Sequence, residues 1–399
     1  MTQPQQQLVR RVIHRQLADY YAQPANLVVG QATGCSKNLS SLLGEWHWKR
    51  VFRKMYEERE GHWLTPVELF QPHYSHIVAD FVHTAALAMP SPNTKLDIIE
   101  LGGGRGTNAC LILDYLKTQK PELYSTLTYT LVDNSPTLHR LQKEKLGNSE
   151  HADLVRFKQK DLLDVAERRT TIVSKSDTPT IVLGFEVLDN LPHDKIRAKS
   201  RKRIQQAEVR RDNKTGEKEE VFVPLTDPLL AKVLKTVPSY AKMYPTWVPT
   251  VACGVLNHLL TQRSNLSFAF ADFDWLPAPD LLDDDSNDSS SSSYSSSSST
   301  WAEGEPIVTD MKGRDYPCYM TCPPHCDILF PTDFQKLASF VKRSLNEKDS
   351  ITAMKQHDFL QTFGPEHVRS TKSWLTGHTP LIDDFGNCSV LTMLPKNFR

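Results

Sequence analysis

The chain has no excess charge of either sign and no long apolar run, and each absence excludes a class of protein. Lysine plus arginine and aspartate plus glutamate number 47 each, so the formal net charge of the 399 residues is zero. A protein that coats nucleic acid normally carries a basic excess, so we expect no nucleic-acid partner. No apolar run approaches the ~20 residues that a membrane-spanning helix needs, so we expect no integral membrane segment.

Cysteine is also scarce. The seven cysteines are few for the length, odd in number and mostly scattered, and the start of the chain lacks the apolar core of a secretory signal. A disulfide-stabilised extracellular protein is therefore disfavoured, and a reducing compartment is favoured.

The start of the chain is basic and amphipathic. Residues 1–18 contain three arginines and no acid, and the apolar positions fall on one helical face at Val9, Val12, Ile13 and Leu17. A mitochondrial presequence has this character. An ordinary amphipathic first helix has it too, and Asp19 with the two tyrosines that follow suits that alternative.

From about residue 93 the chain alternates short β-branched runs with helical segments. The runs that predict strands are 96–101, 127–133, 154–159, 180–184 and 266–271, with later strands at 327–330 and 390–394. The predicted helices lie at 108–117, 136–146 and 334–341, and an earlier helix starts at Thr65 and Pro66 and runs through His76 and Phe81. Alternating strands and helices imply parallel pairing with right-handed crossovers, which is an α/β fold.

These patterns divide the chain into six segments. We expect an N-terminal helical region at 1–92, the first part of the core at 93–202, an inserted hairpin and helical region at 203–262, core strand five at 263–281, a disordered Ser/Asp-rich loop at 282–304 and the C-terminal part of the core at 305–399. The hairpin turn contains Gly216, and its many lysines and arginines are typical of solvated edge strands, with a nucleic-acid arm as the alternative.

A glycine-rich turn follows the first predicted strand, in the sequence IIELGGGRGT at 98–107. Such a turn lets a ligand approach the backbone and directs helix N–H groups at an anion. A dinucleotide fingerprint would need its third glycine at position 107, where Thr107 stands, so a nicotinamide dehydrogenase is disfavoured. The glycines lie instead at Gly102, Gly104 and Gly106, after Glu100. This arrangement resembles motif I of class I S-adenosyl-L-methionine-dependent methyltransferases; a tight structural turn is the alternative.

Two further acids follow the second and third predicted strands. A carboxylate at Asp133 can accept hydrogen bonds from both ribose hydroxyls of a nucleoside, or it can cap the helix that begins after Ser135. Asp161 lies where methyltransferases often contact the adenine amino group, and the alternative is a helix cap before Leu162.

The fourth predicted strand leads into FEVLDNLP at 185–192, which resembles the NEFFDALP segment of the MidA-like family and coincides with it at Glu186, Asp189, Leu191 and Pro192. Segments similar to that family's motifs also occur at 65–68, 100–107, 132–138, 326–334 and 356–360, so the resemblance spans about residues 55–395. The sequence departs from the family pattern at 61–63, at Phe185 and at 272–274, and these differences concern the acceptor more than the cofactor.

The resemblance implies a Rossmann-like class I S-adenosyl-L-methionine-dependent methyltransferase sheet with N-terminal helices and an inserted, substrate-facing α/β region. The implied cofactor is S-adenosyl-L-methionine, and its candidate binding residues are Glu100, Gly102, Gly104, Gly106, Asp133 and Asp161. The family includes the mitochondrial arginine methyltransferase that assists assembly of respiratory complex I. The implied acceptor is therefore an arginine of a protein such as a complex I subunit, and the implied location is mitochondrial, with a cytoplasmic location as the alternative.

The candidate catalytic residues are Glu186, Asp189 and His193. Two carboxylates can hold a guanidinium and turn one nitrogen toward the methyl group. His193 would remove a proton, although an ordinary loop histidine is the alternative. A non-catalytic assembly or scaffolding factor with the same fold, or a paralogue with another methyl acceptor, are the alternative functions.

The cysteine-rich stretch near the C-terminus predicts no metal site. Cys318, Cys322 and Cys326 are spaced C-x3-C-x3-C, with His325 beside the last. Structural zinc sites favour C-x2–4-C pairs with four ligands, and radical S-adenosyl-L-methionine enzymes use C-x3-C-x2-C, a pattern that this sequence misses by one residue.

Overall fold

The computed structural model describes residues 5–24, 28–30, 38–58, 64–89, 95–200, 203–212, 215–279, 304–345 and 349–395. The Ser/Asp-rich stretch, Cys35 and the family departure at 61–63 lie outside these residues.

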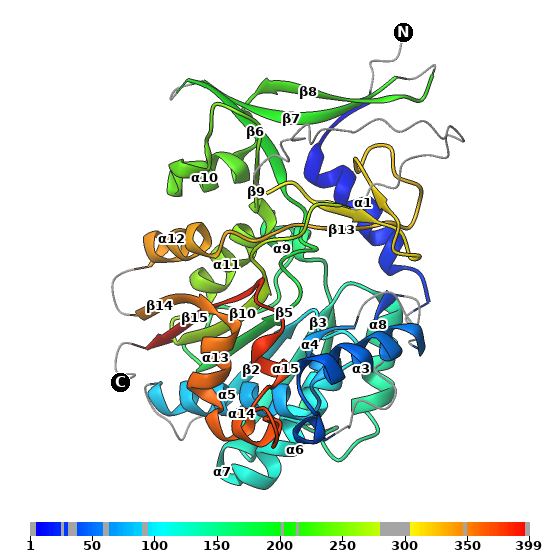
Figure 1. The fold of residues 1–399 in the computed structure, drawn as a ribbon. Helices are drawn as coiled ribbons and strands as arrows, with labels where there is room; N and C mark the ends of the chain where they lie inside the picture. Colours follow the sequence, from blue (N-terminus) through cyan, green and yellow to red (C-terminus); the bar gives the residue numbers. More distant parts are fainter. Residues whose placement is uncertain are drawn as a thin grey trace, which may run out of the picture.

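A seven-stranded sheet in the order β14-β15-β10-β5-β2-β3-β4 forms the centre of the molecule (Figure 1). Its strands are β14 (Asp349–Lys355), β15 (Cys388–Pro395), β10 (Leu266–Phe273), β5 (Thr180–Phe185), β2 (Leu96–Leu101), β3 (Leu127–Asp133) and β4 (Val155–Gln159). The run from β10 to β4 is parallel, and β15 is antiparallel to both of its neighbours. The predicted Rossmann-like α/β class is confirmed, and β14 is a strand that the sequence patterns did not predict.

Helices cover both faces of this sheet, which is why its central strands are nearly continuous apolar runs. On β2, Ile98 packs into a core with helices α5 (His73–Ala88), α6 (Thr107–Gln119) and α13 (Gln356–Phe363). The next residue, Ile99, packs into a second core with α9 (Leu162–Ala166), α11 (Thr250–Gln262) and α12 (Phe334–Ser344). Alternate residues of one strand therefore anchor two helical layers.

The long helix predicted after Thr65 is wrong in its extent. It is split into α4 (Pro66–Leu69) and α5, because Pro72 lies between them and cannot donate the N–H that a continuous helix needs. The predicted cap is present, since Thr65 Oγ1 accepts a hydrogen bond from the Glu68 N–H at 3.3 Å. The Glu68 carboxylate does not reach back, and accepts instead from Gln71 Nε2 at 2.8 Å.

The inserted region forms a second, antiparallel sheet above the first one in Figure 1. Its strands are β1 (Gln5–Leu8), β6 (Asp194–Ser200), β7 (Arg203–Arg211), β8 (Lys218–Pro224) and β9 (Thr246–Val248). The predicted hairpin is the β7–β8 pair. Strand β7 is not an edge, however, because β1 and β6 pair along its other side.

The remaining elements are short or peripheral. A small third sheet contains β11 (Ile307–Thr309), β12 (Asp315–Tyr316) and β13 (Asp327–Leu329). The other helices are α1 (Val9–Tyr21), η1 (Leu39–Ser41), α3 (Glu45–Glu58), α7 (Pro121–Tyr124), α8 (Pro136–Leu146), α10 (Pro228–Thr236), η2 (Pro238–Tyr240), α14 (Pro365–Thr371) and α15 (Pro380–Asp383). Within the described ranges, no helix combines the length and the apolar character that crossing a bilayer requires.

The basic first helix, α1, is built into the fold. Its apolar face is buried against the second and third sheets through Val9, Ile13, Leu17 and Tyr20. Arg10 is only 1% exposed. It donates to Asp194 Oδ2 at 2.7 Å, to Asp227 Oδ2 at 2.6 Å and to Glu167 Oε1 at 3.0 Å. Burial alone would lower the pKa of Arg10, but the attraction of Asp194 and Asp227 outweighs it and raises that pKa.

Replacing Arg10 should be far more damaging than replacing its neighbour. We expect Arg10→Ala to lower the free energy of unfolding by about 3–5 kcal/mol, because the buried Asp194 and the largely buried Asp227 lose their cation, whereas Glu167 keeps Arg11 and Arg169. Arg11, whose side chain is 41% exposed, pairs only with Glu167 in the described structure. Arg11→Ala should therefore cost at most about 1 kcal/mol. Urea unfolding of both variants measures the difference, and equal losses would contradict the assignment.

Candidate functional site

A cavity of about 710 Å³ opens at the carboxyl ends of the parallel strands. This edge lies where the order of the strands reverses, with β3 on one side of β2 and β5 on the other, and such a switch point is the usual ligand site of open α/β sheets. The predicted site residues that line the cavity are Glu100, Gly102, Gly104, Asp133, Asp161, Glu186 and Asp189. Gly106 and His193 do not line it.

The glycine-rich turn uses its glycines for different purposes. Gly102, Gly104 and Gly106 have φ values of +68°, +51° and +78°, a region that favours glycine. A Cβ at Gly104 would meet nothing within 4 Å, so the backbone here faces open space. A Cβ at Gly103 would lie 2.3 Å from Leu131 Cδ2, so this position is required by packing. Gly106 is the N-cap residue of α6, directly before its first residue.

Glu100 lies beneath this turn, and both of its carboxylate oxygens accept hydrogen bonds from the protein. Its Oε1 accepts from Asn108 Nδ2 at 2.7 Å, and its Oε2 accepts from the Tyr129 hydroxyl at 2.9 Å. Burial raises the pKa of Glu100, while these two donors act in the opposite direction. The carboxyl group therefore ties β2 to the first turn of α6 and to β3.

Asp133 is joined to the same turn by a residue that the sequence patterns did not reveal. The Ser135 N–H donates to Asp133 Oδ1 at 2.9 Å, and Gln142 Nε2 donates both to Asp133 Oδ2 at 3.1 Å and to the Gly104 carbonyl at 2.9 Å. Burial raises the pKa of Asp133 to about 6. The available signal was a glutamine between Leu138 and Leu146 on the inner face of α8.

Asp161 caps the helix α9, as the alternative interpretation predicts, and it also lines the cavity. Its Oδ1 accepts from the Leu163 N–H at 2.8 Å, and its Oδ2 lies 2.7 Å from His14 Nε2. His14 belongs to α1, which also contributes Leu17 and Tyr21 to the cavity wall. The Tyr21 hydroxyl donates to Asn190 Oδ1 at 2.5 Å. The first helix thus forms one side of the cavity.

Glu186 and Asp189 also line the cavity, and among the described residues the one donor to their carboxylates is the backbone N–H of Asn190, which acts on Asp189. Glu186 has a φ of +55° directly after β5, and no side-chain bond joins it to the described residues. Asp189 is 3% exposed, and its Oδ1 has no partner among those residues. Burial, followed by the negative charge of Asp272, raises the pKa values of both groups. Two such carboxylates suit a cationic ligand.

Asp272, at the end of β10, shapes the segment that carries this pair. Its Oδ2 accepts from the Leu188 N–H at 2.7 Å and from the Asp189 N–H at 3.1 Å. Burial raises the pKa of Asp272 to about 6, against the effect of these backbone donors. The sequence marked Asp272 only as a departure from a family motif, although its carboxylate positions the candidate catalytic segment.

The structure does not bring His193 together with Glu186 and Asp189. His193 lines a second cavity, of about 740 Å³, which is also lined by Tyr240, Trp247, Asp274 and Thr332. Its Nδ1 lies 2.8 Å from the Leu191 carbonyl, and its ring stacks on Phe330 with centroids 4.1 Å apart. Burial lowers its pKa to about 4, so the ring is neutral at physiological pH. This placement gives no support to proton removal by His193 in the first cavity.

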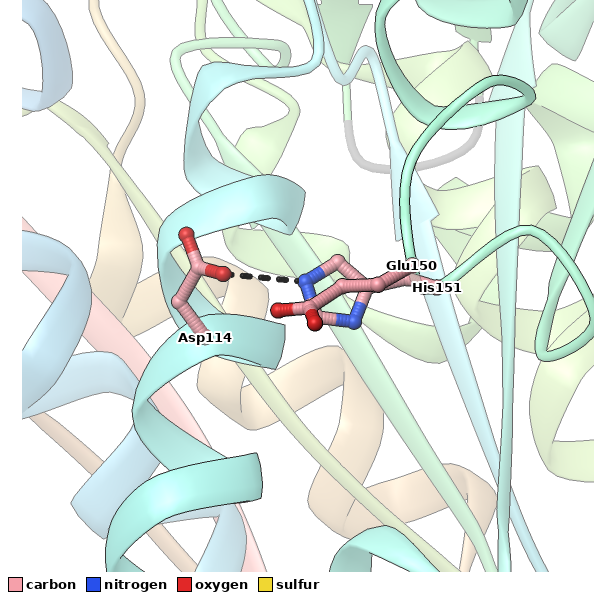
Figure 2. A group of neighbouring side chains, drawn as sticks. All are labelled: Asp114, Glu150 and His151. Carbon is pink, nitrogen blue, oxygen red and sulfur yellow. Dashed lines mark hydrogen bonds and ion pairs between the residues drawn. The ribbon is translucent and has the colours of Figure 1, made fainter.

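The described residues bring together one group with metal-ligand chemistry, formed by Asp114, Glu150 and His151 with ligand atoms within 4.8 Å of one another (Figure 2). Asp114 lies 3.0 Å from His151 Nε2, and the Tyr124 hydroxyl lies 2.8 Å from Nδ1, so both ring nitrogens have partners. Lys117 pairs with Glu150. The group is therefore an ion-pair network beside α6. It contains none of the three cysteines of the C-x3-C-x3-C stretch, and none of its members lines the first cavity.

Comparisons with known proteins agree with this fold. A family model described as "Putative S-adenosyl-L-methionine-dependent methyltransferase" matches residues 77–351. No curated protein matched the sequence.

Two solved structures from Burkholderia thailandensis have similar folds. One is described as a "likely methyl transferase" bound to S-adenosyl-homocysteine; it is 16% identical with a TM-score of 0.59, and the match covers 97% of this chain and 87% of that chain. The other is an uncharacterized protein of the same superfamily, 18% identical with a TM-score of 0.57, and the match covers 81% and 79% of the two chains.

Removing the Gln142 amide should change the titration of Asp133. Gln142→Met keeps a similar volume but deletes the donor to Asp133, so we expect a higher pKa for Asp133 and a loss of about 1–3 kcal/mol in the free energy of unfolding. NMR titration of labelled aspartates and urea unfolding measure the two effects. Asn148→Ala is the control, because that amide donates only to the exposed Glu144 carbonyl. An unchanged Asp133 pKa would show that the hydrogen bond from Gln142 does not stabilise the ionised form of Asp133.

Proposed function

The chain belongs to the family described as "Putative S-adenosyl-L-methionine-dependent methyltransferase", and we propose that it methylates an arginine side-chain nitrogen of a protein acceptor. S-adenosyl-L-methionine is the cofactor, and it supplies a methyl group on a positively charged sulfur that is already activated for transfer. The protein therefore has to align the acceptor nitrogen with that methyl group and favour the nucleophilic arrangement of the acceptor.

The residues of the first cavity fit this cofactor. The open space at Gly104 leaves room for close approach to the backbone of the turn. Asp133 accepts hydrogen bonds from Ser135, Gln142 and the Asn134 N–H, and its two oxygens together retain acceptor capacity for a ribose hydroxyl. In this proposal Gly102, Gly104 and Asp133 contact the cofactor, and Asp161 borders its adenine. Glu100 acts through Asn108 and Tyr129, to which its oxygens are bonded.

The carboxylates of Glu186 and Asp189, which among the described residues have only the Asn190 N–H as a donor, are the observation that carries the choice of arginine. A guanidinium stays protonated, with a pKa above ~12, and presents five N–H donors in a planar fork. The buried Asp189 carboxylate and the half-buried Glu186 carboxylate can bind several of these donors and compensate the cation. The new nitrogen–carbon bond forms as the sulfur–carbon bond breaks, and the methylated nitrogen releases one proton. The raised pKa of Glu186 suits this carboxylate to accept that proton.

We extend the proposal to a mitochondrial setting, with a subunit of respiratory complex I as the acceptor. The support is the resemblance of residues 185–192 to the MidA-like segment and the basic character of residues 1–18. Cleavage that removed α1 would leave Asp194 and Asp227 without the cation that Arg10 supplies, so this proposal requires that helix in the working enzyme.

Neutralising Glu186 should separate catalysis from cofactor binding. We expect Glu186→Gln to lower the methylation rate by about 100-fold or more, because the guanidinium loses a charged acceptor, while the Kd for S-adenosyl-homocysteine changes by less than about twofold. The assay is incubation with labelled S-adenosyl-L-methionine and a mitochondrial extract, followed by mass spectrometry of the labelled proteins. Glu122→Gln, at an exposed position on α7, is the control.

The outcomes of that assay separate the candidate functions. Unchanged methylation by Glu186→Gln would refute the catalytic role of Glu186. Tight binding of S-adenosyl-homocysteine by the wild type, with no labelled protein, would favour the assembly or scaffolding alternative. Label on a residue other than arginine would indicate a paralogue with another acceptor.

Cofactor affinity should depend on the ionisation of Asp133. Its pKa of about 6 means that the carboxylate is charged at pH 7.5 and protonated below pH 6. A protonated group is a poorer acceptor for ribose hydroxyls, so the Kd for S-adenosyl-homocysteine should rise as the pH falls through 6. Calorimetry between pH 5 and pH 8 tests this. Asp133→Asn should bind weakly and lose most of the pH dependence, and an unaltered pH profile in that variant would exclude Asp133 as its source.

A further inference from the structure

We propose that one exposed apolar patch of this protein binds the surface of a lipid bilayer that carries anionic headgroups. The patch consists of Leu43, Trp46, Trp374 and Leu375, whose exposed fractions are 38%, 62%, 74% and 58%. These four are half of the eight large hydrophobic side chains that are exposed in the described residues. None of them lines either cavity, so the patch is separate from the candidate site and its role does not depend on the proposed function.

Two segments that are far apart in the sequence are bonded together to form the patch. The buried Ser373 hydroxyl donates to the Leu42 carbonyl at 2.5 Å, and the Trp374 N–H donates to the Ser40 carbonyl at 3.2 Å. These bonds hold the turn after η1 against the turn after α14. The leucine and tryptophan of one segment therefore lie beside those of the other.

Helix α3 is anchored by one tryptophan and exposes another. Trp48 is only 1% exposed, its ring centroid lies 5.9 Å from that of Phe70, and its Nε1 donates to Asp384. Trp46 precedes it by two residues, which turns the Trp46 side chain to the opposite face of the helix. The core is therefore filled without Trp46, and the indole that remains on the surface is available to a partner.

Basic side chains continue the patch along the outer face of α3. The residues that follow Trp46 at steps of three or four, all of them exposed, are Lys49, Arg50, Arg53 and Lys54. This spacing places them on one stripe of the helix. A tryptophan at one end of a basic stripe gives this face both an apolar and a cationic part.

The acids of α3 do not neutralise this stripe. The two whose side chains are described are Glu45 and Glu57, and Glu45 pairs with Lys49 at 2.6 Å. Arg50 and Arg53 have no ion pair among the described residues. Two guanidinium groups beside the patch are therefore free to attract an anion.

The segment after α14 contributes one more cation. Lys372, two residues before the tryptophan of that segment, is exposed and has no ion pair among the described residues. The acids around it have partners, because Glu366 pairs with Arg369 at 2.7 Å and Asp383 pairs with His378 at 2.8 Å. The patch is therefore bordered by three cations without a counter-ion and by one acid, on α3, without a partner.

This combination of side chains favours a lipid surface over a protein partner. Tryptophan rings settle at the level of the headgroups, leucine side chains insert at the boundary with the acyl chains, and lysine and arginine attract anionic lipids. Interfaces between proteins are instead poor in lysine, and poor in charge at their centre. Apolar side chains bordered by cations without counter-ions are thus complementary to an anionic bilayer surface.

The test mixes the full-length protein with vesicles of phosphatidylcholine, with or without phosphatidylserine, and measures the bound fraction by sedimentation. At low salt we expect binding to the phosphatidylserine vesicles to be tighter by about 10-fold or more, because each cation near an anionic surface adds to the attraction. Most of this difference should disappear at ~1 M salt, where the Debye length is ~3 Å. A protein that does not sediment with phosphatidylserine vesicles at low salt would overturn the proposal.

Paired substitutions assign the binding to this surface. Trp46→Ser combined with Trp374→Ser removes the two rings, and Arg50→Gln combined with Arg53→Gln removes two cations. Each pair should weaken binding to phosphatidylserine vesicles by about 10-fold or more. All four positions are exposed and lie outside the first cavity, so an unchanged Kd for S-adenosyl-homocysteine is expected and shows that the fold is intact. Undiminished vesicle binding by the tryptophan pair would contradict the assignment.

The controls change the same kinds of side chain elsewhere on the surface. Leu87→Ser combined with Met243→Ser removes two exposed apolar side chains, and Arg140→Gln combined with Arg156→Gln removes two exposed cations. Both should bind vesicles like the wild type, and losses equal to those of the patch variants would show that the patch is not the binding surface. A wild type that is dimeric by light scattering, monomeric after the tryptophan substitutions and unable to sediment with vesicles would identify a second copy of this chain as the occupant instead.

Discussion

Buried carboxylates at the carboxyl edge of the central sheet are the constraint on which the site depends. Such groups are costly unless donors surround them. Glu100 and Asp272 are surrounded, because side-chain and backbone N–H or O–H groups reach both of their oxygens. Glu186 has no such donor among the described residues and Asp189 has only the Asn190 N–H, although both lie on the segment that Asp272 shapes. The fold thus satisfies the acids that hold the site together and leaves oxygens of the other two available at the cavity.

The first helix joins the stability of the fold to the shape of the site. Arg10 neutralises acids that come from three separate parts of the chain, and four residues later His14 meets Asp161 at the wall of the first cavity. Because both contacts belong to one helix, the cavity wall is fixed by an interaction that lies outside it. A segment that reads as a targeting signal by composition therefore has an architectural role in the folded chain.

The parts of the molecule that could be predicted from sequence are those with local causes. The parallel strands are buried on both faces, so they appear in the sequence as apolar runs. The glycine-rich turn can be predicted from its glycine content. The helix predicted after Thr65 is too long because Pro72 interrupts it, and β14 is not predicted because its sequence, DSITAMK, is neither strongly apolar nor clearly alternating. Gln142 and the separation of His193 depend on how distant segments meet, and no local pattern records that.

The positions of the partners of Arg10 have a consequence for the order in which the molecule assembles. The helix that carries it is made before the acids that it needs, which lie 157, 184 and 217 residues further along the chain. On the ribosome the charge of this helix remains unmatched until the residues up to Asp227 have emerged. Native contacts between such distant segments are slow to form, so we expect the cofactor pocket to be completed late in biogenesis and the nascent chain to expose surface that chaperones bind until then.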